Sequence, residues 1–231
     1  MLASLTKSEA VYRETRWRIL TGALPPSTAI NQADLALQFG VSPTPVREAL
    51  RRLESEGLVT FVAHAMVLVS ALDLREFDDL YAIRVRLDPF AGQLAALNRT
   101  PDDIALLEEL LHPQPPADGQ VHDRFETNRK FHRAVYSASG NRQLTAMLDQ
   151  LWDRTERYRV ILVANESDDG AKSLLRRHSD EDHEAIASAL ITGDAGRVEA
   201  LLQGHVQRSH DTIRAILEES MPQLAARPQP R

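Results

Sequence analysis

Histidines are the side chains in this 231-residue sequence best suited to bind a metal, because the chain has eight of them and no cysteine. Three of the eight, His132, His183 and His205, stand in three separate segments with apolar residues at helical spacing around them. This spacing predicts that each imidazole turns toward the inside of a helical bundle. Asn128 precedes His132 by four residues and therefore lies on the same helix face.

Two interpretations of these histidines are open. A single inward histidine is usually a core residue with its own hydrogen-bond partner, and three such residues would need three partners. Three imidazoles that meet at one divalent cation satisfy their nitrogens together. Neutral imidazole suits zinc first, and also nickel, iron or manganese. The amide oxygen of Asn128 would be a fourth, weaker ligand, with room left for water or a small acid.

The elements that must position these residues are long amphipathic helices. Helices are expected at roughly 101–111, 120–139, 141–164, 171–192 and 194–219. A longer one begins near residue 74, where the apolar residues recur at spacings of three and four: Leu80, Ile83, Leu87, Phe90, Leu94 and Leu97. Pro89 should kink or break this helix locally. Residues 75–220 are thus predicted to form an all-α bundle of about six helices, followed by a disordered tail over 221–231.

The first 70 residues have a different pattern. Helices are expected at about 9–21, from Asn31 to Gly40, and from Pro43 onward, with a turn-rich extended link before the second. The stretch after Gly57 is rich in valine and predicts two short strands around Ala63–Met66. The fold class is therefore mostly α: a winged helix-turn-helix over 1–70, a short linker over 71–74, and the helical bundle.

The segment VSPTPVREALRRLESEGLV (41–59) contains the start signal and both faces of the third predicted helix. Ser42 is placed as its N-cap, where a hydroxyl can accept an orphan backbone N–H, and Pro43 falls at the first helical position. One face carries four apolar residues that we expect to be buried: Val46, Ala49, Leu50 and Leu53. The opposite face carries Thr44, Arg47, Glu48 and Arg51. In a helix-turn-helix this exposed half enters the major groove, although exposed arginines are often simply solvated.

Charge and hydropathy limit the function classes. The net charge of −6 argues against a globally basic nucleic-acid binder, but residues 1–70 are net +1 and the rest net −7. A DNA-binding N-terminal domain therefore needs a local basic face. No segment approaches the roughly 18 consecutive apolar residues of a membrane span, and none resembles a secretory signal. We expect a cytoplasmic protein with no membrane partner.

The segment ADLALQFGVSPTPVREALRRLESEGLV closely resembles the winged helix-turn-helix of the GntR family of bacterial transcription regulators. The resemblance implies that Thr44, Arg47 and Arg51 face double-stranded DNA, next to Ser42 at the helix start. Two departures stand out. Pro43 replaces an arginine that is frequent in the family, and the hairpin tip AHAM lacks the usual basic residue and glycine. His64 is the candidate for a polar contact at this tip.

The region from Leu74 to about Leu217 is similar to the FCD effector domain of the FadR-type branch of that family. The similar segments are LYAIRVRLDPFAGQLAA, NRKFHRAVYSASGN and DEDHEAIASALITGDAGRVEALLQGHV. The resemblance maps the family's metal ligands onto Asn128, His132, His183 and His205, and an effector-binding arginine onto Arg84. Arginines 133, 154 and 157 are lesser candidates for that role. It further implies a small organic acid effector beside a divalent metal, a homodimer on a palindromic operator, and repression.

A metal-dependent hydrolase is the alternative function, because an open coordination site can activate water. No inward carboxylate stands out in the sequence as a general base. Glu184 neighbours His183 but points about 100° away on a helix. The sequence therefore favours a ligand-responsive regulator and not an enzyme.

Overall fold

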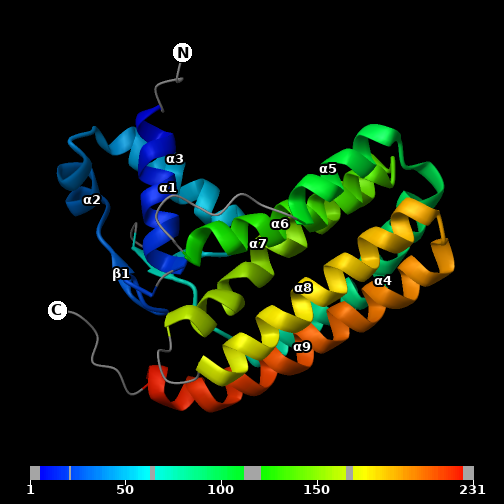
Figure 1. Cartoon of the computed structure of the whole chain (residues 1–231). Coiled ribbons are helices and arrows are strands. Elements are labelled where there is room, and N and C mark those ends of the chain that lie inside the picture. Colours follow the sequence, from blue (N-terminus) through cyan, green and yellow to red (C-terminus); the bar gives the residue numbers. More distant parts are fainter. Residues whose placement is uncertain (1–5, 21, 63–65, 112–120, 165–168, 226–231) are drawn as a thin grey trace. The chain divides into compact units, whose positions relative to one another are not determined.

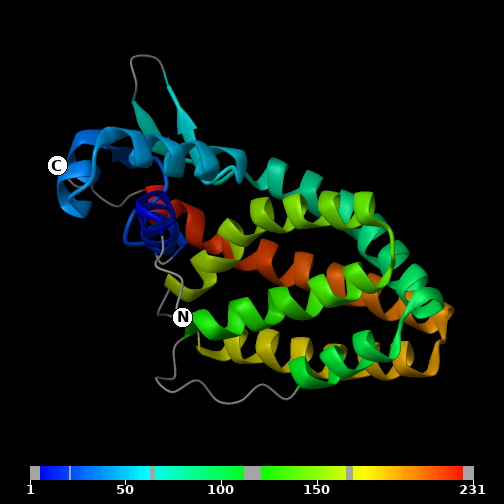
Figure 2. The same cartoon turned by 90° about the horizontal axis from the view of Figure 1, so that it is seen from above.

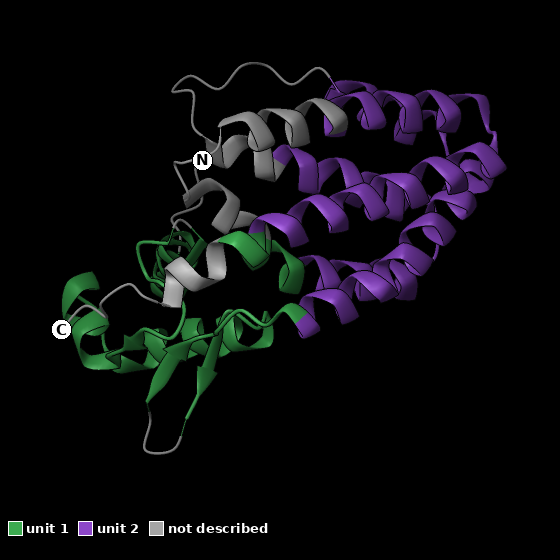
Figure 3. Cartoon of the chain, turned by 90° about the horizontal axis from the view of Figure 1, so that it is seen from below, with its two compact units in different colours: residues 1–74, 153–165, 217–231 green, residues 75–152, 166–216 purple. Residues whose placement is uncertain are grey.

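The computed structural model of the chain is mostly helical, with a small three-stranded sheet (Figure 1). It describes residues 6–20, 22–62, 66–111, 121–164 and 169–225, with side chains described in 6–20, 22–62, 66–111, 127–158 and 179–219. The chain forms two compact units (Figure 3). Unit 1 comprises Met1–Leu74, Asp153–Asn165 and Leu217–Arg231, and unit 2 comprises Arg75–Trp152 and Glu166–Ile216.

Unit 1 contains three short helices and the sheet. The helices are α1 (Lys7–Leu20), α2 (Gln32–Phe39) and α3 (Pro43–Ser55). The strands are β1 (Ala29–Ile30), β2 (Val59–Phe61) and β3 (Val67–Val69), antiparallel in the order β1-β3-β2. The predicted hairpin is present as β2 and β3. The sequence missed β1, because a two-residue strand is too short to show any periodicity.

Local sequence signals set the boundaries of α2. The side chain of Asn31 accepts hydrogen bonds from the backbone N–H groups of Ala33 and Asp34, so the predicted N-cap is confirmed. Gly40 ends the helix in the left-handed conformation at φ 60°, which glycine adopts without steric cost. The Gly40 N–H caps carbonyls of the last turn. The turn between α2 and α3 is thus encoded by two residues.

The start of α3 differs from the prediction in one respect. Ser42 occupies the N-cap position with extended backbone angles, but its side chain makes no capping hydrogen bond. A capping side chain bonds the N–H of the second or third helical residue. The third residue here is Pro45, which has no N–H. The four residues of the predicted apolar face are all buried, as expected: Val46, Ala49, Leu50 and Leu53.

Six further helices are present among the described residues, the number that the sequence predicts, and their parts in unit 2 pack lengthwise as a bundle (Figures 1 and 2). They are α4 (Leu74–Asn98), α5 (Pro101–Leu111), α6 (Val121–Ala138), α7 (Arg142–Ala164), α8 (Asp169–Thr192) and α9 (Ala195–Ala225). The last helix continues past its predicted end near residue 219 and includes Pro222. Residues 226–231 of the predicted tail lie outside the described residues. Among the described residues, no helix is long and apolar enough to cross a membrane.

The long helix α4 corrects two expectations. It runs through Pro89 as one helix, so the proline does not break it, and of the two predicted effects only the kink stays a prediction. Only half of the expected stripe faces the core: Leu80 is buried, and Leu87 and Leu94 pack against the core. The other half does not, because Ile83, Phe90 and Leu97 are 47%, 44% and 66% exposed. Besides Leu80, the buried face carries aromatic, small and charged side chains: Phe77, Tyr81, Arg84, Asp88, Pro89, Ala91, Gly92, Ala95 and Ala96. Small residues on this face permit close helix contact, which bulk hydrophobicity does not reveal.

Candidate functional site

Three histidines from three helices of unit 2 meet in the interior of the bundle. His132 on α6, His183 on α8 and His205 on α9 are all buried. One ring nitrogen from each lies within 4.8 Å of those of the other two. The Nε2 atoms of His132 and His183 are 3.3 Å apart, and the ring centroids of the three pairs are 5.0–5.1 Å apart. The structure therefore brings together the three histidines that the sequence selected.

This geometry fits a divalent metal. Zinc–nitrogen bonds of about 2.0–2.1 Å in a tetrahedron place two ligand nitrogens about 3.3–3.4 Å apart, which matches the measured separation of His132 and His183. Asn128 lies one turn before His132 on α6, and both polar atoms of its amide are buried without a hydrogen-bond partner. A buried amide of this kind is costly unless a ligand satisfies it. Imidazole nitrogens with one amide oxygen are a donor set suited to zinc and its neighbours.

A carboxylate supports one of the three histidines. The Nδ1 atom of His205 lies 3.0 Å from Oδ2 of Asp182, and Nη2 of Arg208 donates to Oδ1 of Asp182 at 2.5 Å. Burial by itself raises the pKa of Asp182, but the hydrogen bonds from His205 and Arg208 outweigh it and lower the pKa to about 2. Asp182 is therefore ionised at neutral pH and accepts a hydrogen bond on each oxygen.

Aromatic rings form part of the surroundings of the triad. Phe131 stacks on His183 with ring centroids 4.1 Å apart, and the ring of Trp152 lies 4.9 Å from that of His132. The indole N–H of Trp152 donates to the hydroxyl of Tyr136, which donates in turn to Asp88 at 2.7 Å. Burial, first, and the charge of Asp88 raise the pKa of Tyr136 well above its ordinary value, so this hydroxyl stays protonated.

Arg84 extends the hydrogen-bonded chain of Trp152, Tyr136 and Asp88. It is buried at 2% exposure, donates to Asp88 at 2.8 Å, and its guanidinium carbon lies 4.5 Å from the ring centroid of Trp152. Burial by itself lowers the pKa of Arg84, but the charge of Asp88 outweighs it and the pKa ends above its ordinary value. The sequence predicts that Arg84 flanks a leucine stripe and binds the effector. The structure places it in a buried ion pair connected to His132 through Trp152.

The other arginines considered for the effector lie elsewhere. Arg133 is exposed and 3.5 Å from Asp149. Arg154 is also exposed. Arg157, in the part of α7 that belongs to unit 1, donates to the carbonyl of Gly57 at 2.6 Å. Neither Arg133 nor Arg157 is described beside the triad, so Arg84 stays the predicted effector-binding arginine.

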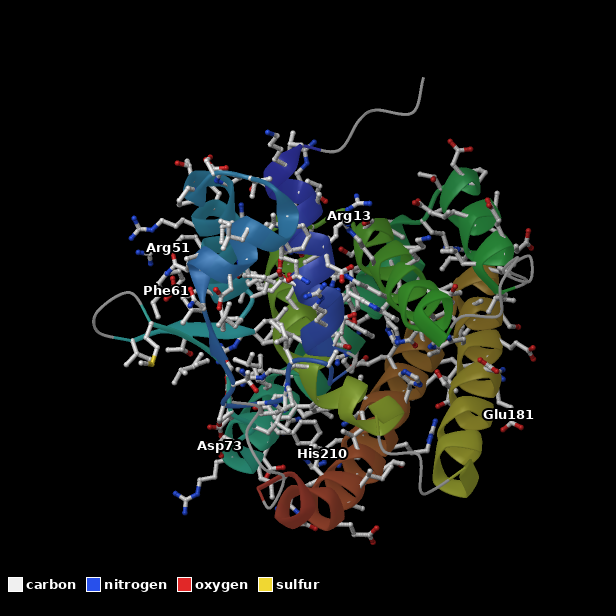
Figure 4. All side chains as sticks on the ribbon, turned by 90° about the vertical axis from the view of Figure 1, so that its left-hand side faces the viewer. Arg13, Arg51, Phe61, Asp73, Glu181 and His210 are labelled. Carbon is white, nitrogen blue, oxygen red and sulfur yellow. The ribbon has the colours of Figure 1, made fainter. Side chains whose placement is uncertain are left out.

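The predicted DNA-reading face of α3 is exposed. Ser42, Thr44 and Arg47 are all solvent-accessible, and Arg47 makes no ion pair or hydrogen bond within the described part of the chain. Arg51 is exposed as well, but it is paired with Glu54 at 2.9 Å and lies over the ring of Phe61 on β2, as Figure 4 shows. His64 lies outside the described residues. Of the two arginines predicted to face DNA on α3, Arg47 is therefore the one without a described partner.

Sequence reasoning did not identify three residues that contact the predicted site residues: Asp88, Asp182 and Trp152. The spacing of Arg84 and Asp88, four residues apart on one helix, could have revealed their ion pair. Nothing in the sequence signals that Asp182, which neighbours His183, would contact His205 on another helix. Trp152 likewise reaches His132 only through the packing of α7 on α6. Glu184 is exposed, as its position predicted.

Comparison with known families finds matches in two consecutive regions of the chain. Residues 7–65 match the family described as bacterial regulatory proteins, gntR family, and residues 79–208 match the FCD domain. Both families are those of transcription regulators, so the hydrolase alternative is not supported. The FCD match alone covers more than half of the chain.

Individual relatives are transcription regulators as well. The HTH-type transcriptional regulator McbR of Escherichia coli K12 is 36% identical over 146 residues, which is 62% of this chain and 66% of that protein. The solved structure of E. coli McbR/YncC has a TM-score of 0.75 at 30% identity and covers 94% of this chain and all of that one. The HTH-type transcriptional repressor RspR of E. coli K12 is 26% identical over 215 residues, 92% of this chain and 91% of that protein. The chain is therefore a member of the gntR family of bacterial transcription regulators that carry an FCD effector-binding domain.

Proposed function

We propose that this protein is a repressor whose helical unit binds a small organic acid beside a divalent metal and thereby changes DNA binding by the winged helix-turn-helix. The observation that carries the proposal is the buried triad of His132, His183 and His205. Three polar rings from three helices are expensive to bury unless they share one function. A transcription regulator with such a site at the centre of its effector domain is a sensor.

The triad would hold the metal, with Asn128 as a weaker fourth ligand. Zinc fits the nitrogen-rich set best, and nickel, iron and manganese remain alternatives. An amide in place of a carboxylate removes one negative charge, which disfavours the harder cations. A metal with an open coordination position supplies a Lewis acid for a carboxylate oxygen of the effector.

Arg84 would contribute to the effector site through its ion pair with Asp88. A guanidinium has five N–H donors, so it can bind a second carboxylate while one donor is held by Asp88. Because Asp88 balances its charge, Arg84 would recognise the shape and acceptors of the acid more than its net charge. Effector binding must favour one arrangement of the protein over the other in order to switch DNA binding.

DNA recognition would rest on the exposed start of α3. Thr44 and Arg47 are placed to contact base edges or phosphates, with Ser42, Arg51 and His64 as further contacts. A helix-turn-helix that reads a palindrome is a symmetric dimer, so we propose a homodimer on a twofold operator. The name of the relative RspR, a repressor, supports repression as the direction of control.

The test combines metal content, thermal melting and DNA binding of the purified protein. We expect about one zinc per chain in the wild type and none in His132→Ala, with one acid from a panel of small carboxylic and hydroxy acids raising the Tm of the wild type only. Absence of bound metal in the wild type, or an equal response of both proteins to the acid, would refute the sensor.

DNA binding is tested with duplexes selected from a random library on the wild type. Arg47→Gln should weaken binding by about 1–3 kcal/mol. Arg86→Gln, which removes the same charge from an exposed position of α4, should leave binding unchanged. Equal weakening by both variants would show that only net charge matters. No sequence preference in the selection would contradict operator recognition.

A further inference from the structure

One histidine of the triad, His205, contacts a carboxylate on a neighbouring helix. His205 on α9 is buried at 3% exposure, and its Nδ1 faces Oδ2 of Asp182 on α8 at 3.0 Å. These helices run side by side in Figure 1. Asp182 directly precedes His183 in sequence, yet its side chain contacts the next helix. One short segment of α8 thus contributes a histidine to the triad and a carboxylate to another histidine of the triad.

This contact determines which nitrogen of neutral His205 carries the proton. The Arg208 guanidinium donates to Oδ1 of Asp182, and Oδ2 lies 3.0 Å from the ring, so this carboxylate is placed as an acceptor on both oxygens and Nδ1 of His205 is the donor. The proton on Nδ1 leaves Nε2 with a free lone pair. Only a deprotonated ring nitrogen can bind a metal. The ring of His205 lies with its centroid 5.0 Å from that of His132 and 5.1 Å from that of His183.

Arg208 holds the carboxylate in this orientation. Its Nη2 donates to Oδ1 of Asp182 at 2.5 Å, so the two carboxylate oxygens have different partners. Arg208 lies one turn after Gly204 on α9, and a Cβ at position 204 would lie 3.0 Å from Nη1 of Arg208. The glycine therefore gives the guanidinium room to lie along its own helix toward α8. Arg208, Asp182 and His205 form a hydrogen-bonded chain that ends at the triad.

We propose that Asp182 is a positioning residue for the metal site: it fixes His205 in the Nδ1–H form and holds its ring so that Nε2 faces His132 and His183. This inference rests on the proposed metal site but concerns a residue outside its ligand set. Outer partners of this kind typically change metal affinity by about 10- to 100-fold when they are removed.

The experiment compares the wild type with Asp182→Asn and with Glu181→Gln. Glu181 is the matched control, because it is exposed, adjacent in sequence and projects from the outer side of α8 in Figure 4. Side-chain nitrogen NMR of the metal-free proteins, with His205→Gln to assign the signal, reports which nitrogen of His205 is protonated. Zinc affinity is measured separately by competition with a chelator.

We expect Nδ1–H for His205 in the wild type and in Glu181→Gln, and a mixture of forms or Nε2–H in Asp182→Asn. Zinc affinity should fall about 10- to 100-fold in Asp182→Asn and stay unchanged in Glu181→Gln. Arg208→Met, which leaves every acidic side chain in place, should produce a smaller loss in the same direction. It provides the comparison if Asp182→Asn folds poorly.

The outcomes separate this inference from the proposed metal site. An Nε2–H form of His205 in the metal-free wild type would overturn the inference whether or not zinc binds. Equal zinc affinity in the wild type, Asp182→Asn and Arg208→Met would also overturn it while leaving the metal site intact. If the wild type binds no zinc although His205 shows Nδ1–H, the metal site fails, and with it a role for Asp182 in metal binding.

Discussion

At the scale of single residues, Arg84 has two roles to separate: it is the proposed effector-binding residue, and it forms a buried ion pair with Asp88. Both side chains are almost fully buried, and Asp88 also accepts the hydroxyl of Tyr136. A buried ion pair is not stabilising in itself, because both ions lose their hydration. Removing one partner is far worse, since the other charge then has no counter-ion. An effect of an Arg84 substitution on effector binding must therefore be separated from its effect on folding.

Arg84→Gln should lower the free energy of unfolding by about 3–5 kcal/mol, because it leaves Asp88 buried and unpaired. Asp88→Asn should also destabilise the protein. The double variant should be more stable than the sum of the two losses predicts, since no charge then remains buried. Chemical denaturation of the four proteins measures this coupling. Additive losses would show that the two side chains do not interact as the geometry indicates.

The double variant also isolates the role of Arg84 in sensing. It removes the guanidinium and keeps a neutral, folded core. If Arg84 binds the effector, the acid that stabilises the wild type should no longer raise the Tm of the double variant. A full response of the double variant would remove Arg84 from the effector site.

At the scale of elements, the packing of α4 on α9 depends on a glycine. A Cβ built at Gly92 would lie 2.1 Å from Cδ1 of Leu202 and 2.8 Å from Cγ1 of Val198. Both distances are far below van der Waals contact, so the two helices pack closely at this point. Gly196, also in a helix, would meet only Oδ1 of Asp194 at 3.9 Å.

Gly92→Ala should therefore destabilise unit 2 by about 1–3 kcal/mol through overpacking, although alanine favours a helix over glycine by roughly 1 kcal/mol. Gly196→Ala should be neutral or stabilising by up to about 1 kcal/mol, because the side chain enters open space. Thermal or chemical unfolding of both variants checks the prediction. Similar values for the two would mean that helix propensity decides the effect and the close approach does not.

The same two helices are joined by a second polar contact. Asp78 on α4 lies 2.9 Å from Nε2 of His210 and 2.9 Å from Nε of Arg214, both on α9. Asp211 contacts the other nitrogen of His210. Burial by itself raises the pKa of Asp78, but the hydrogen bonds from His210 and Arg214 outweigh it and leave the pKa below its ordinary value of 3.8. The ionised form of Asp78 is thus favoured in the folded protein.

A lowered pKa in the folded state contributes stability above pH 3.8, and this contribution is lost as the pH falls through the lower folded value. Asp78→Asn should therefore be less stable than the wild type at neutral pH by a constant amount. The difference should shrink below about pH 4 and vanish once Asp78 is protonated in both states. Urea unfolding from pH 7 to pH 3 measures it. A difference independent of pH would show that the carboxylate charge plays no part.

At the scale of the whole molecule, an exposed apolar stripe on α4 is the candidate interface of the proposed homodimer. Ile83, Phe90 and Leu97 are seven residues apart and 44–66% exposed. A spacing of seven keeps side chains on one side of a helix, as at helix–helix seams. The most economical partner for this stripe is the same stripe on a second copy, because a twofold axis pairs identical surfaces.

Phe90→Glu should weaken self-association about tenfold or more, since it buries an unpaired carboxylate in the interface. Sedimentation of the purified variant at several concentrations measures the effect. Leu106→Glu, at an exposed leucine of α5, is the matched control and should remain dimeric. Dimers of undiminished affinity in Phe90→Glu would move the interface to another surface.

Sequence reasoning succeeded where the signal is local. The caps at Asn31 and Gly40 and the apolar face of α3 follow from neighbours a few residues away. At Ser42 it found the N-cap position but not the missing side-chain bond, since Pro45 removes one of the two N–H donors that a cap can use. On α4 it placed Ile83, Phe90 and Leu97 in the core, where they are exposed, and it missed the buried alanines. Periodicity shows that a helix has two faces, but packing partners decide which one is buried.

For this protein, the sequence alone determined the fold class, the order of the helices and the identity of the three inward histidines. These properties depend on helical periodicity, helix caps and turn residues, which are encoded within short segments. Only the tertiary structure decided that the three histidines meet, that Asp182 supports His205, and that Arg84 is neutralised by Asp88 at a buried site. Contacts between α6, α8 and α9 join residues up to 73 positions apart, between His132 and His205, and no local pattern specifies the distance between them.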